Sequence, residues 1–317
     1  MMGLPARATR DSWRPATTLG VVFVHLVALL APFYYSWQGL AAFLLFYYLT
    51  GCWGVTFGYH RLFSHRSFKA HPLVKYFAAL MGCLTLQSGP LWWSAHHRLH
   101  HRESDKPMDP HSPKDGFLWS HMLWFNYTHP SLASNEAIYK AVPDLSQDAV
   151  LRWMDKHFEA ISIAKAALLW GLSALIWDLS VAWSVLLWGC FLRTVVLWHG
   201  TWLINSATHC WGYKSYDSGD DSLNNPWVTV FTFGEGWHNN HHARQRPARS
   251  GHRWYELDPT YWHIALLNAL GLVWDVVPLT AKSAKPVLTP VSGTSAAGVK
   301  RQAAQVTPPT QKQTIKR

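Results

Sequence analysis

The stretch GLAAFLLFYYLTGCWGVTFGY, residues 39–59, carries no charge and is followed at once by HRLFSH, residues 60–65. A transmembrane helix needs about 20 mainly apolar residues. The segment therefore predicts a membrane span that ends on two histidines, His60 and His65.

The rest of the chain repeats this apolar pattern. Short polar links at 36–38 and 178–180 would join neighbouring spans in pairs. The sequence thus predicts an all-α integral membrane protein with four transmembrane helices in two hairpins. The other three predicted spans are residues 19–35, 161–177 and 181–205.

The distribution of basic residues predicts how these hairpins are oriented. Arg7, Arg10 and Arg14 precede the first span, and no Lys or Arg follows until Arg61, just past the second. The link between the third and fourth spans has none either. By the positive-inside rule, we expect a multi-pass protein with both termini and the active site on the cytoplasmic side.

A fifth apolar segment, residues 73–93, is long enough to cross but contains Lys75 and a polar break at 87–90. We expect it to lie in the membrane plane or to re-enter without crossing. All the histidine clusters then share one compartment. Lys165 and Arg193, inside the third and fourth spans, should snorkel or face the bundle interior.

Composition fits a membrane protein with a large polar part. Charged residues make up 15% of the chain, against about 25% in an average soluble protein. Seven of the ten net positive charges lie in a tail without aromatic residues, which argues against nucleic-acid binding. We predict a cytoplasmic segment 1–18, a cytoplasmic helical cap from 94–159 and 206–278, and a disordered basic tail 279–317.

Two histidine trios have helical metal-ligand spacing. His97, His100 and His101 stand at positions i, i+3 and i+4, as do His238, His241 and His242. Such positions share one face of a helix, so each trio can direct three imidazoles to one point.

Four more polar positions stand where spans end. His60 and His65 would point about 140° apart on a regular α-helix, so we expect a break between them. Asn205 and His209 stand four residues apart at the end of the fourth predicted span. Imidazole is an ordinary ligand for iron, zinc and copper. Because these histidines exceed what one ion can use, they imply two metal ions.

The motifs HRLFSHRSF (60–68), HHRLHH (96–101), NSATH (205–209) and GEGWHNNHHA (234–243) resemble those of membrane-bound fatty acyl desaturases of the Δ9, stearoyl-CoA-desaturase-like group. The resemblance runs from about residue 19 to residue 278. It also includes ESDKPMDPHSPKDGFLWSHMLW at 103–124.

This resemblance implies a nonhaem centre of two Fe²⁺ ions, with O2 and two electrons as co-reactants. Iron is redox-active, whereas zinc is not. Glu103, Asp105, Asp109 and Glu235 are candidates to accept the outer imidazole N–H bonds, with a solvated loop face as the equal alternative for each acid. The implied ligands are His60, His65, His97, His100, His101, His209, His238, His241 and His242, with Asn205 acting through a bound water.

The resemblance further implies a long saturated acyl chain as substrate, held in a bent apolar tunnel, with a cis double bond inserted at Δ9. Gln87, Trp93, Thr201 and Trp202 would surround the bend. Ordinary aromatic packing at a membrane interface is the alternative for these residues.

The acyl carrier remains open between acyl-CoA and acyl-lipid. Acyl-CoA enzymes of this group have basic pairs where this chain has Tyr127-Thr128 and Lys114-Asp115, and Asp-His where it has His96-His97. CoA is highly anionic, so fewer basic donors disfavour it. The chain lacks an HPGG haem motif, so electrons should come from a separate ferredoxin or cytochrome b5.

Two alternatives stand beside the desaturase. A related di-iron membrane hydroxylase acting on a lipid or sterol would use a similar centre and make an alcohol. A non-enzymatic metal transporter or sensor would instead place its ligands along a path through the membrane.

Overall fold

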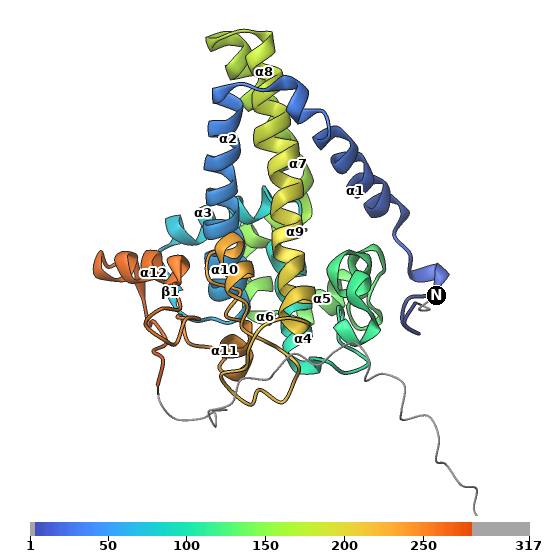
Figure 1. Cartoon of the computed structure of the whole chain (residues 1–317), viewed down its shortest axis with the longest axis vertical. Helices are drawn as coiled ribbons and strands as arrows, with labels where there is room; N and C mark the ends of the chain where they lie inside the picture. The colour runs from blue at the N-terminus through green and yellow to red at the C-terminus, as the bar shows by residue number, and fades with distance from the viewer. Residues whose placement is uncertain (1–3, 281–317) are drawn as a thin grey trace, which may run out of the picture.

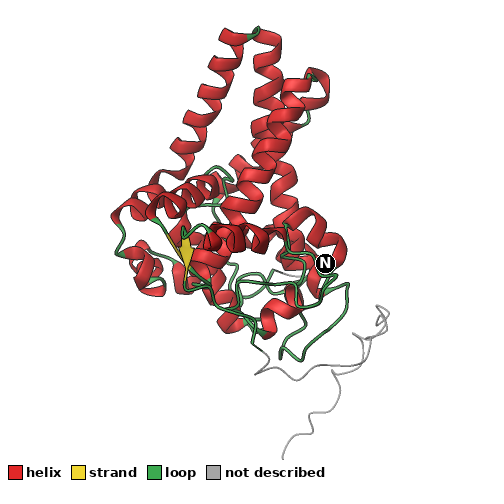
Figure 2. Cartoon of the chain, turned by 90° about the vertical axis from the view of Figure 1, so that its left-hand side faces the viewer, coloured by secondary structure: helices red, strands yellow, loops and turns green. Residues whose placement is uncertain are grey.

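The computed structural model describes residues 4–280, and nearly all of its elements are helices (Figures 1 and 2). The α-helices are α1 Pro15–Ala28, α2 Trp37–Tyr48, α3 Pro72–Cys83, α4 Pro90–Glu103, α5 Asn135–Ala141, α6 Pro143–Ser146, α7 Ala149–Ile176, α8 Leu179–Leu186, α9 Arg193–Ser206, α10 Pro226–Thr232, α11 His238–Ala243 and α12 Pro259–Ala269. The π-helices are η3 Leu49–Ser64, η5 Trp119–Leu123 and η8 Leu187–Leu192. The 3-10 helices are η1 Arg10–Ser12, η2 Ala31–Tyr34, η4 Pro113–Asp115, η6 Trp124–Asn126, η7 Pro130–Leu132 and η9 Ala207–His209. A two-stranded antiparallel sheet pairs β1 Lys69–Ala70 with β2 Val273–Trp274.

The tall helices form two hairpins over a compact base (Figure 1). The links from α1 to α2 and from α7 to α8 lie together at the upper end. Side-chain caps start the second helix of each hairpin: Ser36 accepts from Gly39 N–H before α2, and Asp178 accepts from Val181 N–H before α8. The part of the base formed by residues 65–71, 90–148 and 210–280 is called the cap below.

Three helices of the described chain are long and apolar enough to cross a membrane: 37–64, 149–176 and 179–209. They cover the second and fourth predicted spans and the third up to residue 176, and each extends further toward the cap. The extensions matter because the first and third of these helices end where the cap begins. His60 and His209 therefore lie in the last turns of helices that are long enough to cross a membrane.

The first predicted span, 19–35, is not one continuous helix. Helix α1 ends at Ala28 and is followed by a turn and η2. Its 14 residues measure about 21 Å, short of a hydrocarbon core of about 30 Å. Pro32 lies at the start of η2, where its missing N–H interrupts helical bonding.

The fifth apolar segment, 73–93, is broken as predicted. Helix α3 ends at Cys83, and α4 begins at Pro90, with an irregular loop at 84–89 between them. At 12 residues, α3 is too short to span a bilayer. The turn brings α4 back to the cap, so its histidines lie at the same end as His60.

Side chains of neighbouring helices donate hydrogen bonds to the carbonyls of the last residue of α3 and of the loop at 84–89. Irregular backbone at membrane depth is tolerated only where protein satisfies its polar groups. The donors come from three membrane helices: Ser162 to the Cys83 carbonyl (3.0 Å), Arg193 to Leu84 (3.0 Å), Trp198 to Thr85 (2.8 Å) and Tyr59 to Ser88 (3.1 Å).

Helices η3 and α3 approach so closely that only glycine fits at two contacts. A Cβ at Gly54 would lie 2.6 Å from the Met81 carbonyl carbon, and one at Gly82 would lie 2.2 Å from the Tyr59 ring. Small residues permit such packing where lipid gives helices no hydrophobic drive to associate. This contact positions the end of η3 against the loop at 84–89.

Both cations inside the predicted spans face the protein. Arg193 is buried, and Lys165 lies 3.2 Å from Cys190 Sγ and over the Phe46 ring. The interior-facing alternative is therefore the correct one. The predicted disordered tail falls almost entirely at 281–317, outside the described residues.

Candidate metal centre

Four separate elements bring the histidines together. The end of η3 and the next residue supply His60 and His65, and η9 supplies His209. Helices α4 and α11 each present a trio at the predicted i, i+3, i+4 spacing. The elements converge because α3 and its loop return the chain to the end of η3.

His60 and His65 meet without a helix break, contrary to expectation. The His65 N–H donates to the His60 carbonyl at 3.0 Å, the i to i+5 bond of a π-helix. In this register residues five apart stack on one face, and the two rings lie 4.7 Å apart. The expected 140° separation was wrong because it assumed α-helical geometry.

The nine histidines form two groups, and within each group the ligand nitrogens all lie within 4.8 Å of one another. The five-histidine group contains His60, His65, His97, His101 and His241. The four-histidine group contains His100, His209, His238 and His242.

Spacings in the five-histidine group match a coordination sphere. Nε2 of His97 lies 2.8 Å from Nε2 of His65 and 3.0 Å from that of His101. Nε2 of His241 lies 2.9 Å from that of His101 and 3.1 Å from that of His60. Two imidazoles bound to one ion at about 2.1 Å, at right angles, have nitrogens about 3.0 Å apart.

The four-histidine group leaves buried nitrogens without partners. Both ring nitrogens of His209 and Nε2 of His238 lack a hydrogen bond, while Nε2 atoms of His100 and His242 lie 3.3 Å apart. An unsatisfied buried polar atom costs about 1–3 kcal/mol. A cation accepting these lone pairs would remove that cost, so the residues fit a bound metal.

Burial keeps the imidazoles neutral, as metal ligation requires. Burial, and then the neighbouring histidines, lower the pKa well below 6.5 for His65, His97 and His101. The same causes act on the pKa of His238 and His241. Their nitrogen lone pairs are therefore free to bind a cation at neutral pH.

Carboxylates lie beside the outer nitrogens of four histidines. Three of the four expected acids do so: Asp109 lies 2.9 Å from His100 Nδ1, Glu235 lies 2.8 Å from His60 Nδ1, and Asp105 lies 3.7 Å from His209 Nδ1. Glu103 instead accepts from Arg102 on the outer side of α4.

Asp220 is the acid that the sequence analysis missed. Its Oδ2 accepts from His242 Nδ1 at 2.5 Å, and it also accepts from the hydroxyls of Ser218 and Ser222. Burial raises the pKa of Asp220, but the bond to His242 outweighs burial and lowers it overall. The loop at 211–225 has no periodicity, so no sequence signal pointed to this contact.

A buried cation fixes one of these acids. Arg61 donates to Glu235 Oε1 from Nε at 3.0 Å and to Asp258 Oδ2 from a terminal nitrogen at 3.0 Å. The Ala248 carbonyl accepts a further bond at 2.8 Å. With this support, Glu235 points one oxygen at Arg61 and the other at His60.

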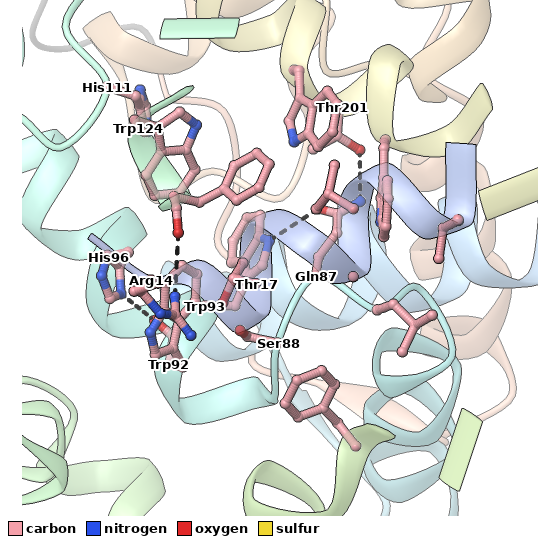
Figure 3. Close-up of a pocket in the computed structure, with 18 of the residues that line it drawn as sticks. Arg14, Thr17, Gln87, Ser88, Trp92, Trp93, His96, His111, Trp124 and Thr201 are labelled. Atoms are coloured by element: carbon pink, nitrogen blue, oxygen red, sulfur yellow. Dashed lines mark hydrogen bonds between the residues drawn. The ribbon is translucent and has the colours of Figure 1, made fainter. Parts of the chain in front are cut away.

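A cavity of about 520 Å³ adjoins the five-histidine group, between α1, α4, α7 and α9 (Figure 3). All four residues expected around a tunnel bend line it. Gln87 donates to Thr201 Oγ1 at 3.1 Å, and Trp93 Nε1 donates to Gln87 Oε1 at 3.4 Å. Trp202, His97 and Asn205 also line the cavity, so it reaches from the loop at 84–89 to the metal centre.

His111 is a further lining residue that the sequence analysis passed over. It is buried, its Nδ1 has no hydrogen-bond partner among the described residues, and its ring lies tilted against that of His100 with centroids 4.2 Å apart. It stands two residues after Asp109, in the Asp-Pro-His run at 109–111. Its place next to a candidate outer acid was the sequence signal that could have identified it.

Comparison with known proteins gives consistent matches. The fatty acid desaturase family profile matches residues 35–274. An sn-2 palmitoyl-lipid 9-desaturase of Nostoc sp. (strain 36) is 42% identical over 82% of this chain and 90% of its own. An sn-1 stearoyl-lipid 9-desaturase of Anabaena variabilis is 43% identical over 86% of this chain and 96% of its own. An acyl-CoA 5-desaturase of Anemone leveillei is 37% identical over 83% and 80%.

Proposed function

The chain belongs to the fatty acid desaturase family, and we propose that it inserts a cis double bond at position 9 of a saturated long-chain acyl group held in a membrane lipid. The overall change is R–CH2–CH2–R′ + O2 + 2e⁻ + 2H⁺ → R–CH=CH–R′ + 2H2O. A methylene pair is oxidised by two electrons, and O2 is reduced by four.

The two histidine groups would each hold one iron, with Asn205 contributing through a water. When bound, the iron pair supplies the redox chemistry that activates O2 against an unactivated C–H bond. The ligand set supports this, because nine neutral imidazoles in a buried pocket suit a redox-active transition metal. The carboxylates at His60, His100 and His242 would hold each ring so that its lone pair faces the metal.

The cavity supports an acyl chain lying against this centre. Its walls are mostly apolar and aromatic, which favours a hydrocarbon and excludes water. The bonded series Trp93, Gln87, Thr201 would fix the bend of the chain beside His97. A chain held at that bend presents one pair of methylenes to the metals, which gives regiospecificity.

An acyl-lipid carrier is favoured over CoA. Two cyanobacterial relatives are named as desaturases of lipid-linked acyl groups, although a plant relative is named as an acyl-CoA desaturase. In this chain Tyr127 and Thr128 occupy positions where a CoA site needs cations. Asp115 forms an ion pair with Arg7, so the positive charge of Arg7 is neutralised as well.

The topology we propose has four crossings, with α1 and η2 together forming the first. Both termini and the cap would face the cytoplasm, where a separate ferredoxin or cytochrome b5 supplies electrons. Arg7, Arg10 and Arg14 before α1 support this orientation.

The single observation that carries the proposal is the convergence of nine histidines beside an apolar cavity. A metal transporter would instead spread its ligands along the membrane path, and the hydroxylase alternative has no relative among those compared above.

Expression in a host that lacks Δ9 unsaturated fatty acids tests it. With a ferredoxin or cytochrome b5 supplied, new cis-Δ9 C16 and C18 chains should be found by mass spectrometry. His100→Ala should abolish them, while His71→Ala, at an exposed position, should not. Alcohols in place of alkenes, or no new products from the wild type, would overturn the proposal.

A further inference from the structure

The cavity carries two formally charged side chains among its described lining residues, Arg14 and Glu159. They have opposite sign and come from different elements. Arg14 precedes α1, and Glu159 belongs to α7. Lys156 is exposed one turn earlier on α7 but is not part of the lining.

Both charges lie where polar sequence gives way to apolar sequence. Arg14 is five residues before Leu19, and Glu159 is two residues before Ile161, the starts of the predicted apolar stretches. This is the level of lipid headgroups on the cap side of the membrane. A lipid whose acyl chain occupies the cavity would place its polar head near this pair.

Arg14 is held in place and retains donors. Its backbone N–H donates to the Asn126 carbonyl at 2.8 Å, and one guanidinium nitrogen donates to the Phe125 carbonyl at 3.3 Å. The guanidinium lies 5.9 Å from the Trp92 ring centroid. Figure 3 shows Arg14 and Trp92 close together at the cavity. Since a guanidinium has five N–H donors, it can still bind an anionic oxygen.

The charges constrain the headgroup. A polyanion such as CoA would meet one cation and one repelling carboxylate. A singly anionic phospholipid would compete with Glu159 for Arg14, and it offers Glu159 no cation in exchange. A head with both a phosphate and an ammonium matches both side chains, and complementary charge governs partner selection.

We propose that the preferred carrier is a zwitterionic glycerophospholipid, with its phosphate at Arg14 and its ammonium at Glu159. The inference rests on the proposed desaturase function and adds the headgroup class. Glu159 is then a specificity-determining residue remote from the metals.

The test uses the full-length, iron-loaded protein in nanodiscs with a reduced donor protein. The discs contain equal amounts of dipalmitoyl phosphatidylethanolamine, phosphatidylglycerol and a monogalactosyl glycerolipid. Double bonds formed in each class are measured by mass spectrometry. The wild type should desaturate the ethanolamine lipid about tenfold faster than the other two.

Glu159→Lys should reverse the preference toward phosphatidylglycerol, and Glu159→Gln should shift it part of the way. Glu136→Lys makes the same charge change at an exposed position paired with Lys140, and should leave the ratio unchanged. Iron content and size-exclusion profile confirm that each variant is folded.

The outcomes separate the two proposals. Double bonds in all three lipids, with a ratio that Glu159→Lys does not alter, overturn the headgroup assignment and leave the desaturase function intact. Preference of the wild type for either other lipid also overturns it. Absence of double bonds from every class would defeat the desaturase function and the headgroup assignment with it.

Discussion

At the scale of single residues, the carboxylates around the metal centre decide how the imidazoles point. Glu235, Asp109, Asp105 and Asp220 each lie beside the Nδ1 atom of one histidine. A carboxylate that accepts the Nδ1–H leaves the Nε2 lone pair for the metal. These acids should therefore affect metal affinity without touching the metal.

Asp220→Asn should weaken iron binding about 10- to 100-fold, because the neutral amide is a poorer acceptor for His242 Nδ1–H. Competition with a chelator measures the dissociation constant. Asp217→Asn, an exposed position in the same loop, is the matched control. Equal affinity for the wild type and Asp220→Asn would contradict the positioning role.

A second residue-scale prediction concerns pH and a histidine outside the metal centre. Burial lowers the pKa of His252 to about 4, whereas the unfolded chain protonates near 6.5. Between these values the unfolded state binds more protons, so stability falls as the pH is lowered from 6.5 to 4. The loss is at most roughly 3 kcal/mol, and less where water screens the ring.

His252→Gln should therefore flatten this dependence. Thermal unfolding midpoints in detergent, measured between pH 7 and pH 4, should fall less for His252→Gln than for the wild type. His71→Gln, at an exposed position, should retain the wild-type slope. A His252→Gln slope equal to that of the wild type would show that His252 does not cause the loss of stability at low pH.

At the scale of elements, the loop at 84–89 connects the membrane helices to the cavity. Leu86 and Ser88 have positive φ values of 57° and 73°, so neighbours must hold this backbone in place. Gln87, between them, bonds Thr201 and Trp93 at the bend. Weaker support for the loop should therefore loosen the position of the acyl chain.

Tyr59→Phe removes one support, the bond from the Tyr59 hydroxyl to the Ser88 carbonyl. We expect a stability loss of about 1–3 kcal/mol and a wider spread of double-bond positions. Tyr47→Phe removes a similar bond, to the Phe231 carbonyl, away from the loop. It should destabilise without changing the products, and an unaltered Tyr59→Phe product spectrum would refute the role of the loop.

Elements whose structure follows from a local sequence pattern were predictable. The trios on α4 and α11 followed from i, i+3, i+4 spacing, and the break after α3 followed from polar residues at 87–90. The π-helical register of η3 was not predictable. It accompanies close packing against α3 at Gly54 and Gly82, and a contact between two helices leaves no mark on the local sequence pattern. The end of α1 at Ala28 was missed because apolar residues continue to Tyr35.

For the site, residue types were predictable but contacts across loops were not. Nine histidines and three outer acids were found from motifs and the family resemblance. Asp220 and Arg14 were not, since Asp220 reaches His242 and Arg14 reaches the cavity only when the loop at 211–225 and the start of α1 fold back. His111 lay within a quoted motif, but only its burial beside His100 drew attention to it.

At the scale of the whole molecule, both hairpin links lie at one end, and helices α4 and α11, which carry the histidine trios, lie at the other (Figure 1). The proposed orientation predicts where labels can reach. In a Cys210→Ser background, Asp178→Cys should react with a membrane-impermeant maleimide in intact cells. Ser218→Cys, in the cap, should react only after permeabilisation. The reverse pattern would contradict the orientation.

The central claim is that distant histidines enclose two separate irons. Anomalous diffraction at the iron edge, from crystals of the iron-loaded protein, tests it most directly. The account predicts two peaks, one within the five-histidine group and one within the four-histidine group. A single peak, or iron bound outside these groups, would contradict it.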